Sequence, residues 1–73
     1  MIESGIDLAI ELNGERRDVR AGTTVRALVR ETLRLSDDRV AVELNRQLLP
    51  RDRWDRALER GDRLEIVTLV GGG

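Results

Sequence analysis

Hydrophobic and polar residues alternate along residues 6–12 of this chain. A period of two predicts a half-buried strand, since successive side chains of a strand point to opposite faces. Asn13-Gly14 follows at once, and this pair favours a type I′ hairpin turn because both residues accept positive φ. The return strand over residues 15–20 is charged, and its Arg16-Arg17 pair is typical of an edge strand protected against unwanted pairing. Ile6, Leu8, Ile10 and Leu12 would share one face of this strand, with Asp7, Ala9 and Glu11 on the other.

A helical period replaces this alternation over residues 25–35. Thr23 or Thr24 supplies a hydroxyl that can cap the start of the helix, and the polar residues Ser36-Asp37-Asp38 are expected to end it. About ten residues make a marginal helix by themselves, so packing against the sheet must hold it. The apolar stripe consists of Val25, Leu28, Val29 and Leu33. The residues expected to point to water are Arg26, Arg30, Glu31 and Arg34.

Alternation resumes over residues 40–44 and predicts a third strand. Asn45-Arg46 turns the chain into a short apolar segment, residues 47–49, which Pro50 stops or confines to an edge. Residues 51–60 follow as a charged connector, long enough for one helical turn. Its mixed charges are interpreted as a solvated face with weak ion pairs.

Trp54 in that connector is expected to cover the core of the domain rather than to anchor a partner, although Trp is enriched at binding hot spots. Gly61-Asp62 makes the last turn before a strand over residues 63–70 that is apolar on both faces. Leu64 and Ile66 are expected to face the core, together with Leu8, Ile10, Leu28, Val29 and Val42. Val67 and Leu69 are expected to face the other way.

The order strand, strand, helix, strand, short strand, strand within 73 residues predicts one small α+β domain. One helix would cover one face of a mixed sheet of four to five strands, and the two most apolar strands, the first and the last, are expected at its centre. Residues 1–70 would form this roll. Within them residues 1–5 are expected to be a frayed extension, and residues 71–73 a flexible glycine tail.

The composition argues against chemistry in the interior of the domain. The chain contains no Cys and no His, which removes disulfides, thiolate chemistry, the commonest zinc ligand and the usual general base near pH 7. The Ser and Thr hydroxyls have no such base to activate them. Asp37-Asp38 cannot alone supply the six oxygen ligands of a hard cation. We therefore expect no catalytic residue, no metal and no cofactor bound by the chain itself.

Charge and hydropathy argue against two classes of partner. The 13 basic and 14 acidic residues give a formal net charge of −1, which creates no strong field for nucleic acid or for an anionic membrane. No apolar run approaches the ~20 residues of a membrane span. The N-terminus also lacks the pattern of a signal peptide. These observations predict a soluble, cytoplasmic domain.

Gly71-Gly72-Gly73 follows the last predicted strand directly. Fully extended, three residues reach about 10 Å beyond that strand, at ~3.3–3.6 Å each. Without Cβ atoms they can enter a narrow cleft. The terminal carboxylate is ionised at neutral pH and can attack the α-phosphate of ATP in the site of another enzyme. A tail without function is the alternative, and the glycines alone do not decide between the two.

Several segments taken together resemble the ThiS family of sulfur carriers, from Ile6 to the C-terminus. The most specific is the ending, which runs from the Gly61-Asp62 turn through Glu65-Ile66-Val67 to Val70-Gly71-Gly72-Gly73. Residues 1–5 look like a short extension to this pattern. The other segments are the Asn13-Gly14 hairpin, the helix opened by Thr23-Thr24-Val25, the segment Val40–Asn45, and Leu49-Pro50-Arg51 with Trp54.

The resemblance implies a ubiquitin-like β-grasp fold and the role of a carrier in thiamine biosynthesis. Gly73 would be adenylated by a ThiF-type adenylyltransferase that uses Mg-ATP, while Gly71 and Gly72 thread into the active sites of partners. A persulfide from cysteine desulfurase, or from another donor, would convert the adenylate to a thiocarboxylate. The thiazole synthase ThiG would then accept the sulfur.

Docking on such partners is expected at the outward side of the last strand. Val67, Leu69 and Val70 are the candidates, because exposed apolar residues without a second covering layer often mark interfaces. The alternative is that the twist of the sheet or the connector with Trp54 covers them. Three other functions stay open: a sulfur carrier for molybdopterin or tRNA thiolation, a ubiquitin-like modifier of target lysines, and an interaction module that does not need its glycines.

Overall fold

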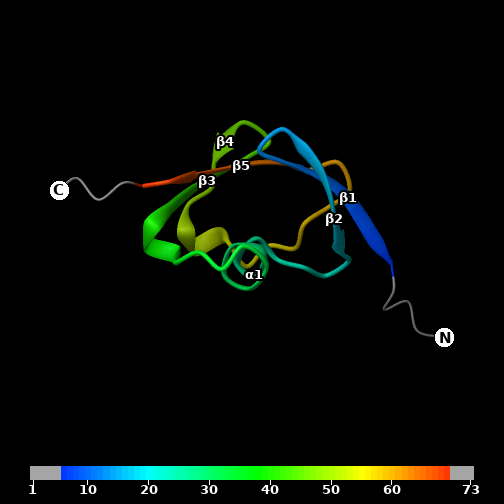
Figure 1. The fold of residues 1–73 in the computed structure, drawn as a ribbon, viewed down its shortest axis with the longest axis horizontal. Helices are drawn as coiled ribbons and strands as arrows, with labels where there is room; N and C mark the ends of the chain where they lie inside the picture. The colour runs from blue at the N-terminus through cyan, green and yellow to red at the C-terminus, as the bar shows by residue number, and fades with distance from the viewer. Residues whose placement is uncertain (1–5, 70–73) are drawn as a thin grey trace.

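The computed structural model describes residues 6–69, which form a five-stranded mixed sheet and one main helical segment. The strands are β1 (Asp7–Leu12), β2 (Glu15–Arg20), β3 (Val40–Leu44), β4 (Gln47–Leu48) and β5 (Arg63–Thr68). They lie in the order β2-β1-β5-β3-β4, so the first and last strands are inside the sheet. The helical segment crosses one face of this sheet (Figure 1). The predicted α+β roll with one helix on a mixed sheet is confirmed.

The two predicted turns have the left-handed backbone that they need. Asn13-Gly14 joins β1 to β2 with φ values of 51° and 86°, and Asn45-Arg46 joins β3 to β4 with φ values of 53° and 73°. Positive φ at both central residues is the signature of a type I′ turn. β2 and β4 are the edges of the sheet, as the charge of Arg16-Arg17 and the stop at Pro50 indicated.

The helical segment begins at the predicted cap. The hydroxyl of Thr24 accepts a hydrogen bond from the Ala27 N–H at 3.0 Å, which satisfies one of the free donors of the first turn. The segment starts as α1 (Val25–Ala27) and continues as a π-helix, η1 (Leu28–Thr32). Within residues 6–69, no helix has the length and hydropathy needed to cross a membrane.

The end of the helical segment differs from the prediction, which placed it at Leu35. The last helical residue is Thr32, and Arg34 follows with a left-handed φ of 57°. The Leu35 N–H then donates to the Val29 carbonyl at 2.9 Å and closes the final turn. The polar stretch that was expected to end the helix forms instead a short 3-10 helix, η2 (Asp37–Arg39).

The core lies between the sheet and the helical segment. Trp54 is 2% exposed and donates its indole N–H to the Leu49 carbonyl at 3.1 Å. It follows a 3-10 helix, η3 (Arg51–Arg53), and covers the core as predicted. Of the expected core residues, Leu8 is only partly buried. The buried apolar residues are Ile10, Leu12, Val19, Val25, Leu28, Val29, Val40, Val42, Trp54, Leu58, Leu64 and Ile66.

Arg26 contradicts the expectation that it points to water. Its guanidinium donates to Asp37 at 2.7 Å, to Asp55 at 2.9 Å and to the Arg51 carbonyl at 3.0 Å. It also lies 5.8 Å from the centre of the Trp54 ring, within range of a cation–π contact. The hydrogen bond with Asp55 is the main cause that raises the pKa of Arg26. Arg26 therefore connects the helical segment to η2 and to the connector.

Candidate functional site

β5 carries the chain toward the C-terminal glycines. Its last described residues lie at the opposite end of the molecule from the start of β1 (Figure 1). The candidates Val70, Gly71, Gly72 and Gly73 lie outside the described residues, so their roles stay predictions. The structure describes instead how β5 is held up to Leu69 and what surrounds it.

On one side, β5 is paired along its whole length with β3. The register is antiparallel and places Val40 opposite Thr68. One residue further, the Leu69 N–H donates to the Arg39 carbonyl at 2.6 Å. Backbone bonds to β3 and to Arg39, the last residue of η2, therefore fix the chain through the last described residue.

On its other side, β5 is held by the side chain of Asn13. β1 pairs with β5 in parallel, and its last register pair is Leu12 with Leu64. Beyond that pair, the Asn13 amide takes the place of a further strand residue. Its Oδ1 accepts the Ile66 N–H at 2.7 Å, and its Nδ2 donates to the Ile66 carbonyl at 3.4 Å. The sequence predicted Asn13 only as a turn residue, and nothing in it signals this second role.

Two substitutions separate the backbone role of Asn13 from its side-chain role. Asn13→Gly keeps the positive φ but removes both hydrogen bonds, and should lower the free energy of unfolding by about 1–2 kcal/mol. Asn13→Ala also introduces left-handed strain and should cost about 1–2 kcal/mol more. Urea unfolding measures both. A glycine variant as stable as the wild type would show that the amide does not support β5.

Asp62 fixes the start of β5 and is the one buried charged residue among residues 6–69, at 5% exposed. Its carboxylate accepts hydrogen bonds from the Glu59 N–H at 2.8 Å, from Arg56 at 3.1 Å and from the Asn45 amide at 3.1 Å. Burial opposes the charged form, but these bonds and the Arg56 charge outweigh it and lower the pKa of Asp62. The Asn45 amide oxygen accepts the Arg63 N–H at 2.9 Å, so the network reaches the first residue of β5. The sequence indicated only a turn at this Gly-Asp pair.

The lowered pKa makes Asp62 a source of pH-dependent stability. Its contribution is complete above the unfolded-state pKa of about 3.9 and is lost as the pH falls through the lower folded-state pKa. Asp62→Asn presents one oxygen and an NH2 group to three donors, and should cost about 1–3 kcal/mol at pH 7.

Urea unfolding of this variant at a series of pH values tests the assignment, with the exposed Asp38→Asn as the control. The stability difference between the wild type and Asp62→Asn should shrink as the pH is lowered below about 4. A difference that stays constant over this range would mean that the charge of Asp62 does not stabilise the fold.

The outer face of the sheet carries exposed apolar residues close to the end of β5. Val67 is 53% exposed, Leu69 47% and Leu48 68%. Ala41 of β3 lies opposite Val67, and Ala41, Leu48 and Leu69 also line a groove of about 240 Å³. We call Ala41, Leu48, Val67 and Leu69 the docking corner. The prediction that Val67 and Leu69 face away from the core is confirmed, and Trp54 is packed in the core. That this corner binds a partner stays a prediction.

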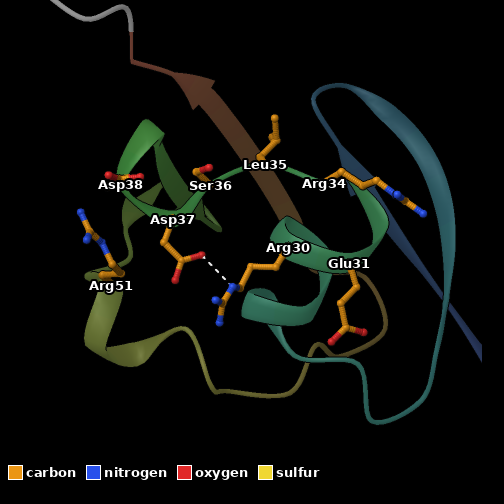
Figure 2. Close-up of a pocket in the computed structure, with 8 residues that line it drawn as sticks. All are labelled: Arg30, Glu31, Arg34, Leu35, Ser36, Asp37, Asp38 and Arg51. Atoms are coloured by element: carbon orange, nitrogen blue, oxygen red, sulfur yellow. Dashed lines mark ion pairs between the residues drawn. The ribbon is translucent and has the colours of Figure 1, made fainter.

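A larger hollow of about 860 Å³ lies beside the end of the helical segment (Figure 2). Arg30 points toward Asp37, with 3.5 Å between Nε and Oδ1, whereas Arg34 and Glu31 point away from it. Ser36 supplies the hydroxyl of this hollow, and neither His nor Lys is among the residues that line it. Among residues 6–69, no cluster of three or more His, Cys, Asp or Glu residues could hold a metal ion. The lining residues are Arg30, Glu31, Arg34, Leu35, Ser36, Asp37, Asp38 and Arg51.

The sheet order and the single covering helix place the protein in the ubiquitin-like β-grasp class. Within that class, the sequence model of the ThiS family matches residues 10–73, and the chain belongs to this family. It is similar to the crystal structure of the thiamine biosynthesis protein ThiS from Geobacter metallireducens. The TM-score is 0.73 at 28% sequence identity, and the match covers 90% of this chain and 100% of that one.

Curated relatives include two larger proteins. The chain is 40% identical over 67 residues to a thiazole synthase of Paramagnetospirillum magneticum, and 36% identical over 67 residues to that of Magnetococcus marinus. In both cases the match covers 90% of this chain and 20% of the relative, so the chain spans about a fifth of their length. It is also 39% identical to the uncharacterized protein ycf40 of Pyropia yezoensis, over 100% of both chains.

Proposed function

We propose that this protein is a sulfur carrier of thiamine biosynthesis and that the α-carboxylate of Gly73 is its reactive group. The observation that carries the proposal is the match to the ThiS family, which extends over residues 10–73 and so includes the glycine ending. The geometry supports it, because β5 is bonded on one side up to Leu69, close to the start of the tail, and on its other side as far as Ile66. The folded body then serves to present the tail to other catalysts.

The proposed chemistry takes place in the active sites of partners. A carboxylate oxygen of Gly73 attacks the α-phosphorus of Mg-ATP, and pyrophosphate leaves. The terminal sulfur of a persulfide then attacks the acyl carbon, and AMP leaves with the electron pair of the broken C–O bond. A thiol reduces the S–S bond of the resulting acyl disulfide and frees the thiocarboxylate. Gly71 and Gly72 would lie in the narrow approach to these sites, where a Cβ would obstruct entry.

The proposed partners follow from this sequence of steps. A ThiF-type adenylyltransferase supplies the first step, and cysteine desulfurase or another persulfide donor supplies the sulfur. We propose thiazole synthase as the acceptor, because two relatives with that name contain a segment similar to this chain. The docking corner is the surface on which these partners would hold the folded body, since exposed apolar groups often mark interfaces. Val70, the next residue in the sequence after Leu69, is proposed to take part as well.

Intact-mass spectrometry tests the proposed function. The protein is incubated with an active ThiF-type enzyme, Mg-ATP, cysteine, cysteine desulfurase and a thiol. We expect first the mass of an acyl-adenylate and then the exchange of one oxygen for sulfur; leaving out ATP should abolish both. If neither product forms although the enzymes convert a known carrier, the proposal is wrong. Covalent adducts with proteins of a lysate would favour a modifier of lysines instead.

A further inference from the structure

Two glutamates face each other on the outer face of the sheet. Glu43 of β3 and Glu65 of β5 are register partners and both are exposed. Directly opposite residues on one face of a sheet have Cβ atoms about 4.5–5.5 Å apart, where like charges destabilise the pair. Among residues 6–69, neither glutamate takes part in an ion pair or in a side-chain hydrogen bond. Within residues 6–69, no direct ion pair or side-chain hydrogen bond therefore offsets this repulsion.

Two other carboxylates on the same face have a basic partner. Glu11 lies 3.6 Å from Arg63, and Asp18 lies 3.3 Å from Arg16. The facing glutamates are therefore a local excess of negative charge and not a general property of the sheet.

The facing glutamates also border the docking corner. Leu48 of β4 is the register partner of Glu43, and Val67 lies two residues beyond Glu65, on the same side of β5. An exposed apolar surface thus has an uncompensated acidic border on the side away from the end of β5. A surface of this kind is complementary to a partner that carries a basic residue beside apolar ones.

We propose that Glu43 and Glu65 together bind one arginine or lysine side chain of the adenylating enzyme while its apolar residues cover the docking corner. This inference rests on the proposed function. In the free protein the two carboxylates repel each other, whereas in the complex a shared cation makes both interactions attractive. Two effects then stabilise the complex relative to the free protein. Binding adds two charge-assisted hydrogen bonds, and it removes the repulsion between the two carboxylates.

The two glutamates are therefore expected to affect folding and partner binding in opposite directions. The test uses Glu43→Gln, Glu65→Gln and the double variant in the full chain. Glu31→Gln is the control, because it removes the same charge from an exposed helical residue that lines the hollow of Figure 2. In the double variant the urea midpoint of the free protein should rise. Its KM in the adenylation reaction should rise about tenfold, with kcat little changed.

The salt dependence of KM is a further measurement, and it would not change if the two glutamates had only a structural role. Added salt should raise the KM of the wild type more steeply than that of the double variant, because salt screens charged rims. The control should match the wild type in midpoint, KM and salt dependence.

The outcomes separate the two proposals. Normal adenylation of the double variant, with the KM and salt dependence of the wild type, would overturn the shared cation and leave the carrier function standing. A lower urea midpoint would refute the repulsion from which the inference starts. No adenylation of the wild type by an enzyme of proven activity would refute the carrier function and this inference with it.

Discussion

A variant that ends at Gly71 is expected to form neither the adenylate nor the thiocarboxylate, while its free energy of unfolding stays that of the wild type. Removal of Gly72 and Gly73 moves the carboxylate that we propose as the reactive group back by about 7 Å along an extended chain. A misplacement of 1 Å can already cost about a hundredfold in rate, so intact-mass spectrometry should detect no product. The fold should be unaffected, because the described contacts of β5 end at Leu69.

A matched deletion at the other end controls for truncation as such. A chain that starts at Ile6 lacks five residues that carry no assigned role, and it should form both products at the rate of the wild type. Urea unfolding of both truncated chains shows whether either has lost stability. If the chain that ends at Gly71 still gained sulfur, the reactive group could not be the carboxylate of Gly73.

Trp54→Ala is expected to cause the largest loss of stability of any single substitution considered for this protein. Trp54 is 2% exposed, and its indole N–H donates to the Leu49 carbonyl at 3.1 Å. Large-to-small substitution of a buried Trp costs about 3–5 kcal/mol. Small domains have only about 5–15 kcal/mol in total, so a substantial part of the variant should be unfolded at 37 °C.

Trp54→Phe separates packing from the hydrogen bond to Leu49. It keeps most of the ring volume and should cost about 1–2 kcal/mol, for the unsatisfied Leu49 carbonyl. Far-UV circular dichroism must follow the urea unfolding, because the chain contains 1 Trp and no Tyr. A loss below about 1 kcal/mol for Trp54→Ala would place the ring outside the core. Trp54 would then be available as an anchor for a partner.

The sheet could be predicted from the sequence because its signals are local. The alternation of residues 6–12 fixes which side chains of β1 face the core, and a shift of one residue would turn all of them outward. Asn13-Gly14 is specific because few residue pairs accept positive φ twice. The central position of β5 follows from its apolar residues on both faces. The same alternation placed Val67 and Leu69 on the outer face.

The features that could not be predicted depend on contacts between distant residues. Asn13 bonds to Ile66 across 53 positions, and Arg26 bonds to Asp55 across 29 positions, so neither contact leaves a periodic signal. The helical segment ends at Thr32, and the left-handed residue that follows it is Arg34, whereas sequence rules look for Gly or Asn at such a position. The burial of Asp62 likewise depends on three donors that meet only in the fold.

One part of the candidate site could likewise be predicted from the sequence, and another part could not. The glycine tail could be identified from the sequence, because it joins an unusual composition to a family pattern that ends at Gly73. The acidic border of the docking corner could not, because it depends on the register that places Glu43 opposite Glu65. The positions of charged residues along the sequence do not show which residues of β3 and β5 lie opposite each other.

The separation of the two ends of the described fold, seen in Figure 1, has a practical consequence. All 13 basic residues of the chain are arginine, so an amine-reactive dye or resin attaches only at the α-amino group. The attached group is connected to the described fold through β1, whose start lies at the opposite end of the fold from the end of β5. Fluorescence anisotropy or surface immobilisation can therefore measure the affinity for each proposed partner without modification of any side chain of the docking corner.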